Sequence, residues 1–137
     1  MSAIMTAEEM KEMLTTMNTI AVVGLSSDPG RPSHQVAKYM QDHGYRVIPV
    51  NPNEEQILGE KCYPSLLDVP EQIDIVNVFR RSETVLPIAQ EAVKAGAKAL
   101  WLQMGIVNEQ AAETARNGGL KVVMDRCIKV EHAKLLN

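Results

Sequence analysis

From Thr19 onward the chain alternates short apolar runs with amphipathic helical segments, and this alternation restricts the fold more than any other feature. The apolar runs are residues 20–23, 47–50, 73–79, 99–102 and 122–124. Strands that alternate with helices pair in parallel through right-handed crossovers. Runs that are apolar throughout are typical of a sheet covered on both faces. The sequence therefore predicts an α/β fold, a doubly wound, Rossmann-like parallel sheet of about five strands with helices on both faces.

The N-terminal segment predicts an extra helix over residues 1–17, before an α/β core over 19–137. Thr6 and Glu9 have the spacing of a capping box. Met10, Met13 and Met17 follow at helical spacing, and we interpret this stripe as packing on the sheet, with a partner surface as the alternative. Residues 51–70 lack periodicity, so we expect a loop there with one short edge strand near Cys62–Tyr63.

Composition excludes several classes of protein. A net charge of −3 over 137 residues argues against nucleic-acid binding, which needs a concentrated basic face. No apolar run approaches the roughly 18 residues of a membrane span, and charged residues replace the apolar core of a signal peptide. Cys62 and Cys127 do not form a disulfide or metal pattern. We expect a reduced, cytoplasmic protein without membrane contact, a monomer or weak homodimer whose protein partner the sequence does not identify.

Four polar or glycine-containing stretches follow four of the predicted strands. They are residues 24–31, 51–52, 79–81 and 103–105. In doubly wound sheets, ligands bind beyond the carboxyl ends of the strands, where the winding direction reverses. We therefore expect these stretches to meet at one edge of the sheet.

The first of these loops suits an anion. Gly24 permits a close backbone approach, Ser26 and Ser27 offer hydroxyls, and Arg31 adds a positive charge. A helix that begins near Pro32 would direct free N–H groups toward the loop. The glycine spacing does not match the G-x-G-x-x-G pattern of dinucleotide sites. A tight turn without a ligand is the alternative.

The end of the second strand argues against a nicotinamide dinucleotide. An acidic residue that binds the ribose is usual there, but this chain has Asn51 and Pro52. After the third strand, Phe79, Arg80 and Arg81 suit an adenine with its phosphates; a core phenylalanine beside two solvated arginines is an equal alternative. Farther along, Gln103 offers an amide, and Gly105 would let a ligand pass close to the backbone.

Five segments together resemble a known family. They are AVVGLSSDPGRPS, YRVIPVNP, DIVNVFRRSE, GAKALWLQMGI and VVMDRCIKVEH. They resemble the small stand-alone coenzyme A-binding proteins of bacteria and archaea, over residues 19–136. The fold implied also resembles the nucleotide-binding domain at the N-terminus of the succinyl-CoA synthetase α subunit. The resemblance implies that residues 1–137 form one coenzyme A-binding domain, with coenzyme A or an acyl-CoA as its small-molecule nucleotide ligand.

The resemblance also implies which residues line the site. Those matching the pyrophosphate loop are Gly24, Leu25, Ser26, Ser27 and Arg31. Those matching the later walls are Asn51 and Pro52, then Phe79 and Arg80, then Gln103 and Gly105. Relatives often carry a lysine after the Asn-Pro pair, where this chain has Asn53, so Arg31, Arg80 or Arg81 would have to supply the charge.

The predicted function is that of a non-catalytic carrier, sensor or regulator in acyl-CoA metabolism. The phosphohistidine domain of the related synthetases does not fit within this length, and we assign no catalytic or metal-binding residue. An NAD(P)-binding redox enzyme or sensor is one alternative. A protein-interaction module with a vestigial nucleotide site, using the methionine stripe or an exposed sheet edge, is another.

Two further residues have open roles at this stage. His34 is either a weak phosphate ligand or acid, or a solvated helix residue, and the second interpretation is favoured. Cys127 lies in the segment MDRCIKVEH, which we interpret as a structural cluster that ties the C-terminus to the sheet. A neighbouring arginine favours a reactive thiolate, so a mixed disulfide with the coenzyme thiol is a minority hypothesis, and a metal site with His132 is a weaker one.

Overall fold

A five-stranded parallel sheet forms the centre of the molecule in the computed structural model, which describes residues 5–136. The strands are β1 (Thr19–Val23), β2 (Arg46–Val50), β5 (Ile75–Val78), β6 (Ala99–Leu102) and β7 (Lys121–Val123), in the spatial order β2-β1-β5-β6-β7. All four pairings are parallel. The doubly wound fold is confirmed, and its winding direction reverses between β1 and β5.

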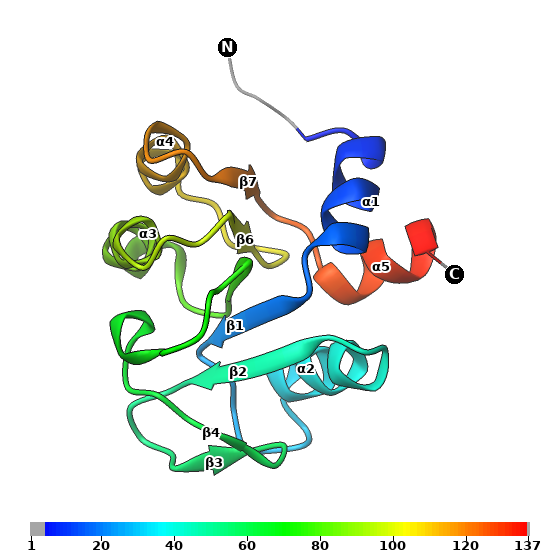
Figure 1. Ribbon diagram of the computed structural model, residues 1–137, viewed down its shortest axis with the longest axis vertical. Coiled ribbons are helices and arrows are strands. Elements are labelled where there is room, and N and C mark those ends of the chain that lie inside the picture. Colours follow the sequence, from blue (N-terminus) through cyan, green and yellow to red (C-terminus); the bar gives the residue numbers. More distant parts are fainter. Residues whose placement is uncertain (1–4, 137) are drawn as a thin grey trace.

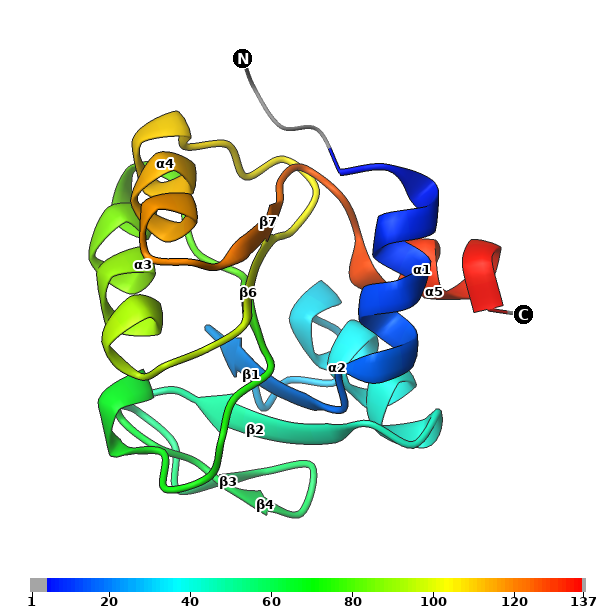
Figure 2. The same ribbon diagram turned by 45° about the horizontal axis from the view of Figure 1, so that its top comes forward.

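Helices cover both faces of this sheet. They are α1 (Ala7–Thr16), α2 (Pro32–Asp42), α3 (Val85–Lys94), α4 (Glu109–Asn117) and α5 (Ile128–Leu136). Figures 1 and 2 show α3 and α4 together on one face, and α1, α2 and α5 on the other. Each face has its own apolar core. Within residues 5–136, no helix has the length and apolar character needed to cross a membrane.

The N-terminal helix is held as the sequence predicts. The Thr6 hydroxyl accepts the Glu9 N–H at 3.1 Å, and the Glu9 carboxylate accepts the Thr6 N–H at 3.0 Å. Met10, Met13 and Met17 are buried in the core beside the sheet. The stripe is thus a packing surface, and it is not available to a protein partner. The part of the predicted helix over residues 1–4 lies outside the described residues.

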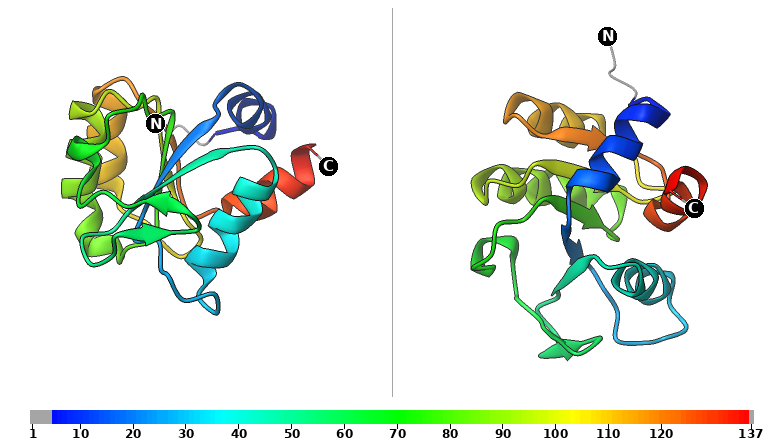
Figure 3. Two further views of the ribbon diagram at one scale, coloured as in Figure 1. Left: turned by 60° about the horizontal axis from the view of Figure 1, so that its bottom comes forward. Right: turned by 45° about the vertical axis from the view of Figure 1, so that its right-hand side comes forward.

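The segment after β2 differs from the prediction. It contains a hairpin of β3 (Gln56–Ile57) and β4 (Glu60–Lys61), followed by the 3₁₀ turn Leu66–Asp68. Leu58 and Gly59 both have positive φ, at 55° and 77°, as a type I′ hairpin turn requires. The expected edge pairing near Cys62–Tyr63 is present in short form, since Tyr63 pairs in parallel with the edge strand β2, whereas the hairpin before it was not predicted. Tyr63 makes a single parallel bridge to Val50. Figure 3 shows the hairpin outside the main sheet.

Asp74 joins the starts of three central strands. Its carboxylate accepts the backbone N–H groups of Asn18 and Thr19 at 2.9 and 3.1 Å, and pairs with Lys98 at 3.3 Å. Burial favours the neutral acid, but the two backbone hydrogen bonds and the Lys98 charge outweigh it and lower the pKa of Asp74. The charged carboxylate therefore stabilises the end of the sheet opposite the strand carboxyl ends.

We expect Asp74→Asn to reduce the free energy of unfolding near neutral pH by about 1 kcal/mol, because an amide is a weaker acceptor than a carboxylate. A lowered native pKa contributes stability above the ordinary value of about 4, and this contribution is lost as pH falls through the native pKa. Urea unfolding between about pH 7 and pH 2 should show a shallower acid decline for Asp74→Asn than for the control Asp42→Asn. Equal declines in the two variants would contradict the role of Asp74.

Candidate functional site

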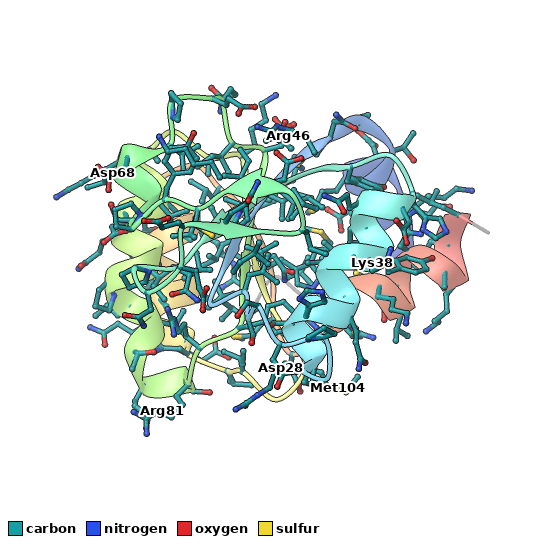
Figure 4. The ribbon with its side chains drawn as sticks, turned by 90° about the horizontal axis from the view of Figure 1, so that it is seen from below. Asp28, Lys38, Arg46, Asp68, Arg81 and Met104 are labelled. Atoms are coloured by element: carbon teal, nitrogen blue, oxygen red, sulfur yellow. The ribbon has the colours of Figure 1, made fainter. Side chains whose placement is uncertain are left out.

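An open cleft of about 770 Å³ lies at the carboxyl ends of β1, β5 and β6. It occupies the point where the winding of the sheet reverses, which is the usual ligand position in this fold. Figure 4 shows Asp28, Arg81 and Met104, from the loops after these three strands, along one edge of the molecule, whereas Arg46 at the start of β2 lies at the opposite edge. The lining residues are Gly24, Ser26, Arg31, Pro32, Ser33, Val36, Phe79, Arg80, Arg81, Gln103, Met104, Ile106, Cys127 and Val130.

Gly24 allows β1 and β5 to approach closely at the floor of the cleft. Its φ is +89°, and a Cβ there would lie 2.4 Å from the Phe79 carbonyl oxygen. Its N–H donates to the Val50 carbonyl at 3.0 Å, which also ties it to β2. The sequence predicts that a backbone or ligand passes close to Gly24, and in the structure it is the Phe79 backbone that does so. Leu25 follows and is fully buried in the core.

The rest of the first loop is held by its own hydrogen bonds. The Ser33 hydroxyl accepts the Ser26 N–H at 3.0 Å, and the Ser26 hydroxyl accepts the Asp28 N–H at 3.0 Å. The His34 Nδ1–H donates to the Ser26 carbonyl at 2.9 Å. His34 therefore stabilises the loop. The sequence analysis considered a phosphate ligand or acid and a solvated helix residue, but not this role. Hydrogen bonds within the chain therefore hold this part of the loop.

The start of α2 opens on this cleft. Its N-cap residue, Arg31, makes no side-chain cap, and Pro32 occupies the first turn. Pro32 has no N–H, and the N–H groups of Arg31 and His34 donate to the Asp28 and Arg31 carbonyls, which leaves the Ser33 N–H and the positive end of the helix dipole at this start. Arg31, Arg80 and Arg81 line the same cleft, and the guanidinium of Arg31 has only a distant partner, Asp28 at 3.9 Å. This end of the cleft has the donors and charge of an anion site.

Several predicted site residues lie behind the cleft rather than in it. The Asn51 side chain donates to the Leu25 carbonyl at 2.9 Å and accepts the Asn53 N–H at 2.8 Å. The Ser27 hydroxyl donates to Glu54 at 3.1 Å, toward the loop after β2. Asn51 and Leu25 thus position the first loop, and Ser27 is directed to a carboxylate rather than to the cleft.

Pro52 lies beside a smaller hollow of about 180 Å³, together with Val50, Ser65 and Arg80. Arg80 also lines the main cleft and a third hollow next to Thr84 and Ile88. The Arg80 side chain therefore stands where these hollows adjoin, and it can contact a ligand that extends from one to the next.

Gln103 connects the sheet to α5 at the inner wall of the cleft. Its Oε1 accepts the Ile128 N–H at 2.9 Å and the Asn77 amide at 3.3 Å. The residue is 6% exposed, and its Nε2 has no partner among residues 5–136. No fully buried side-chain nitrogen or oxygen in this part of the chain lacks a partner, so the unpartnered Nε2 must be partly exposed. Because Gln103 lines the cleft, that exposure is toward the cleft.

The segment after β7 is tied to β6 by two hydrogen bonds and to the loop after β6 by a third. Trp101 Nε1 donates to the Arg126 carbonyl at 2.8 Å, the Arg126 N–H donates to Leu102, and the Asp125 carboxylate accepts the Gly105 N–H at 2.6 Å. The structural interpretation of MDRCIKVEH is thus confirmed. Gly105 has φ +87° with open space around it. The described residues contain no group of three side chains suited to a metal ion.

Of the apolar wall of the cleft, the sequence placed only Met104 at this edge, within the stretch 103–105. Val36 comes from α2, Met104 and Ile106 come from the loop after β6, and Val130 comes from α5. Val36 stands one helical turn after Pro32, so helical spacing could have placed it toward the loop. Ile106 and Val130 come from segments whose path depends on tertiary contacts. Met104 and Val130 are 64% and 44% exposed.

These features define an α/β protein with an open, arginine-lined cleft at a topological switch point. Residues 18–133 match the model of the CoA binding domain family, and the chain belongs to that family. It is 50% identical to the uncharacterized protein YneT of Bacillus subtilis over 91% of this chain and 93% of the relative. A hypothetical protein from Pyrococcus horikoshii has the same fold, with a TM-score of 0.95 and 40% identity, over 100% of this chain and 99% of that one.

The chain is also similar to part of a larger enzyme. It is 28% identical to the α subunit of acetate–CoA ligase [ADP-forming] II of Pyrococcus furiosus, over 85% of this chain but only 28% of the subunit. The ligase activity belongs to a protein of which this chain spans about a quarter.

We expect Gly24→Ala to lower the free energy of unfolding more than Gly96→Ala does, by about 1–3 kcal/mol. Both glycines have positive φ, but a Cβ at Gly96 has open space whereas a Cβ at Gly24 meets the Phe79 carbonyl. Both variants therefore carry the backbone strain, and only Gly24→Ala forces β1 and β5 apart. Equal losses in urea unfolding would show that the close contact is not needed.

Proposed function

We propose that this protein binds coenzyme A or an acyl-CoA in the cleft, as a carrier, sensor or regulator and without catalysing a reaction. The observation that carries the proposal is the composition of the cleft. Its lining combines the uncapped start of α2 and three arginines with a free amide donor and an apolar wall. Membership of the CoA binding domain family supports the same ligand.

The chemistry of the cleft fits each part of coenzyme A. The pyrophosphate suits the start of α2 with Arg31 and Arg80, since helix starts and guanidinium groups both bind phosphate oxygens. The adenine suits the Phe79–Arg80 segment and the adjoining hollow beside Pro52. The amides of the pantetheine arm suit the Gln103 Nε2 donor. A cleft of about 770 Å³ lies within the usual range for ligand sites.

The predicted site residues contribute to this proposal in two ways. Those in contact with the ligand would be Gly24, Ser26, Arg31, Pro52, Phe79, Arg80, Gln103 and Gly105. Leu25, Ser27 and Asn51 would shape the first loop from behind. The Asn51 amide occupies the position where an NAD site usually carries its ribose-binding acid, which favours coenzyme A over a nicotinamide dinucleotide.

The proposal of a non-catalytic, cytoplasmic role rests on the side chains around the cleft. Within residues 5–136, His34 is the histidine nearest the anion end, and its Nδ1 is already bound to the Ser26 carbonyl. This contact fixes the His34 ring on the first loop and leaves its Nε2 open, but no carboxylate among the described residues hydrogen-bonds the ring as the orienting partner of a general base. Cys62 and Cys127 are free thiols, which accords with a reducing compartment.

We expect isothermal titration to show coenzyme A binding that weakens about 10- to 100-fold in Arg80→Ala, because a charge-assisted contact to phosphate contributes about 1.5–3 kcal/mol. Lys94→Ala is the matched control, since it removes one positive charge at the end of α3, away from the cleft residues. Its affinity should equal that of the unaltered protein.

The same titration separates this proposal from the NAD(P) alternative. NADH and NADPH should give no saturable heat at concentrations that saturate the site with coenzyme A. Binding of NADH in the absence of binding of coenzyme A and acetyl-CoA would overturn the proposed function.

A further inference from the structure

Cys127 is the cysteine that lines the cleft, and it lies directly before α5. Its side chain is half-buried and packs against the core beside α2 and α5. The cleft residues Ser33 and Val36 come from α2, and Val130 comes from α5. Cys127 therefore lies on the side of the cleft that α2 and α5 form, together with Val36 and Val130.

Gln103 marks the same place as a ligand position. The Gln103 Oε1 accepts the N–H of Ile128, the residue bonded to Cys127, at 2.9 Å. Gln103 is 6% exposed, its Nε2 makes no hydrogen bond within residues 5–136, and since no fully buried polar side-chain atom there lacks a partner, this Nε2 is the part of the residue open to the cleft. It can therefore donate to a ligand acceptor beside Cys127. An amide of the pantetheine arm is such an acceptor, and that arm ends in a thiol.

We propose that Cys127 is a site of thiol–disulfide exchange with the disulfide form of coenzyme A. This inference rests on the proposed function, because the cleft has to hold one half of the disulfide. The Cys127 thiolate attacks one sulfur of the coenzyme disulfide, the sulfur–sulfur bond breaks, and a Cys127–coenzyme A mixed disulfide forms. The other half leaves as coenzyme A thiolate and takes up the proton that Cys127 released, so Cys127 is oxidised and one coenzyme sulfur is reduced.

Cys62 provides an internal contrast. It is 6% exposed and belongs to the core beside β2 and α2. Burial, aided by the Glu54 charge, raises the pKa of the Cys62 thiol, which disfavours the thiolate that performs exchange. Cys62 is also absent from the cleft lining. The two thiols of the chain thus differ in access to a bound coenzyme, and exchange should be confined to Cys127.

The test is the intact mass of the full chain after incubation with coenzyme A disulfide, with glutathione disulfide at the same concentration in a parallel sample. We expect one coenzyme adduct per chain, reversed by dithiothreitol, retained in Cys62→Ala and absent in Cys127→Ser. Because the cleft positions the reacting sulfur, the reaction should be on the order of tenfold or more faster with coenzyme A disulfide than with glutathione disulfide. Arg80→Ala should slow the coenzyme reaction and leave the glutathione reaction unchanged.

Three results would overturn the inference: no adduct, an adduct on Cys62, or equal rates with the two disulfides. Titration of Cys127→Ser with reduced coenzyme A distinguishes these failures from a failure of the proposed function. Binding that persists in Cys127→Ser, with no adduct on the unaltered protein, means that the cleft binds coenzyme A without exchange. Absence of binding in both proteins means that the proposed function itself is wrong.

Discussion

The close contact between the backbones of Gly24 and Phe79 determines the shape of this molecule's cleft. β1 and β5 are neighbours in the sheet, but the segments that follow them lead to helices on opposite faces. The two chains must therefore separate immediately after a point where they nearly touch. A glycine with φ +89° makes that possible, since a Cβ would lie 2.4 Å from the Phe79 oxygen. Arg80 and the first loop then diverge on either side of the opening.

The charges around this opening oppose the net charge of the chain. The protein carries −3 overall, but Arg31, Arg80 and Arg81 line the cleft together with the start of α2. On the outer side of the first loop, the Glu54 carboxylate accepts a hydrogen bond from the Ser27 hydroxyl. Because that carboxylate is negatively charged, an anion is favoured on the other side of the loop, toward α2. The same cleft has apolar side chains from α2, α5 and the loop after β6, and the Gln103 Nε2 adds an amide donor. A lining of this mixed character matches a ligand that carries both phosphates and an uncharged arm.

The sheet, its helices and the edge that carries the site were predictable because they follow from local periodicity and from one topological rule. The capping box at Thr6 and the buried methionines required no tertiary information. The hairpin around Leu58–Gly59 was not predicted, because it depends on a leucine adopting positive φ. Likewise, the roles of Asn51 and His34 depend on hydrogen bonds to Leu25 and Ser26, which no spacing in the sequence encodes. In the sequence, residues that support a loop by hydrogen bonds look the same as residues that face a ligand. Only the folded structure shows which of the two roles each residue has.

The central claim is that coenzyme A occupies the cleft at the carboxyl ends of β1, β5 and β6. Titration with coenzyme A followed by amide chemical shifts tests it residue by residue. The account predicts the largest changes at residues 24–34, 79–81, 103–106 and 127–130. A second hollow of about 430 Å³ lies between α1 and β7, lined by Met10, Val122 and Asp125 among others. Changes concentrated around that hollow, with the four cleft segments unaltered, would contradict the account.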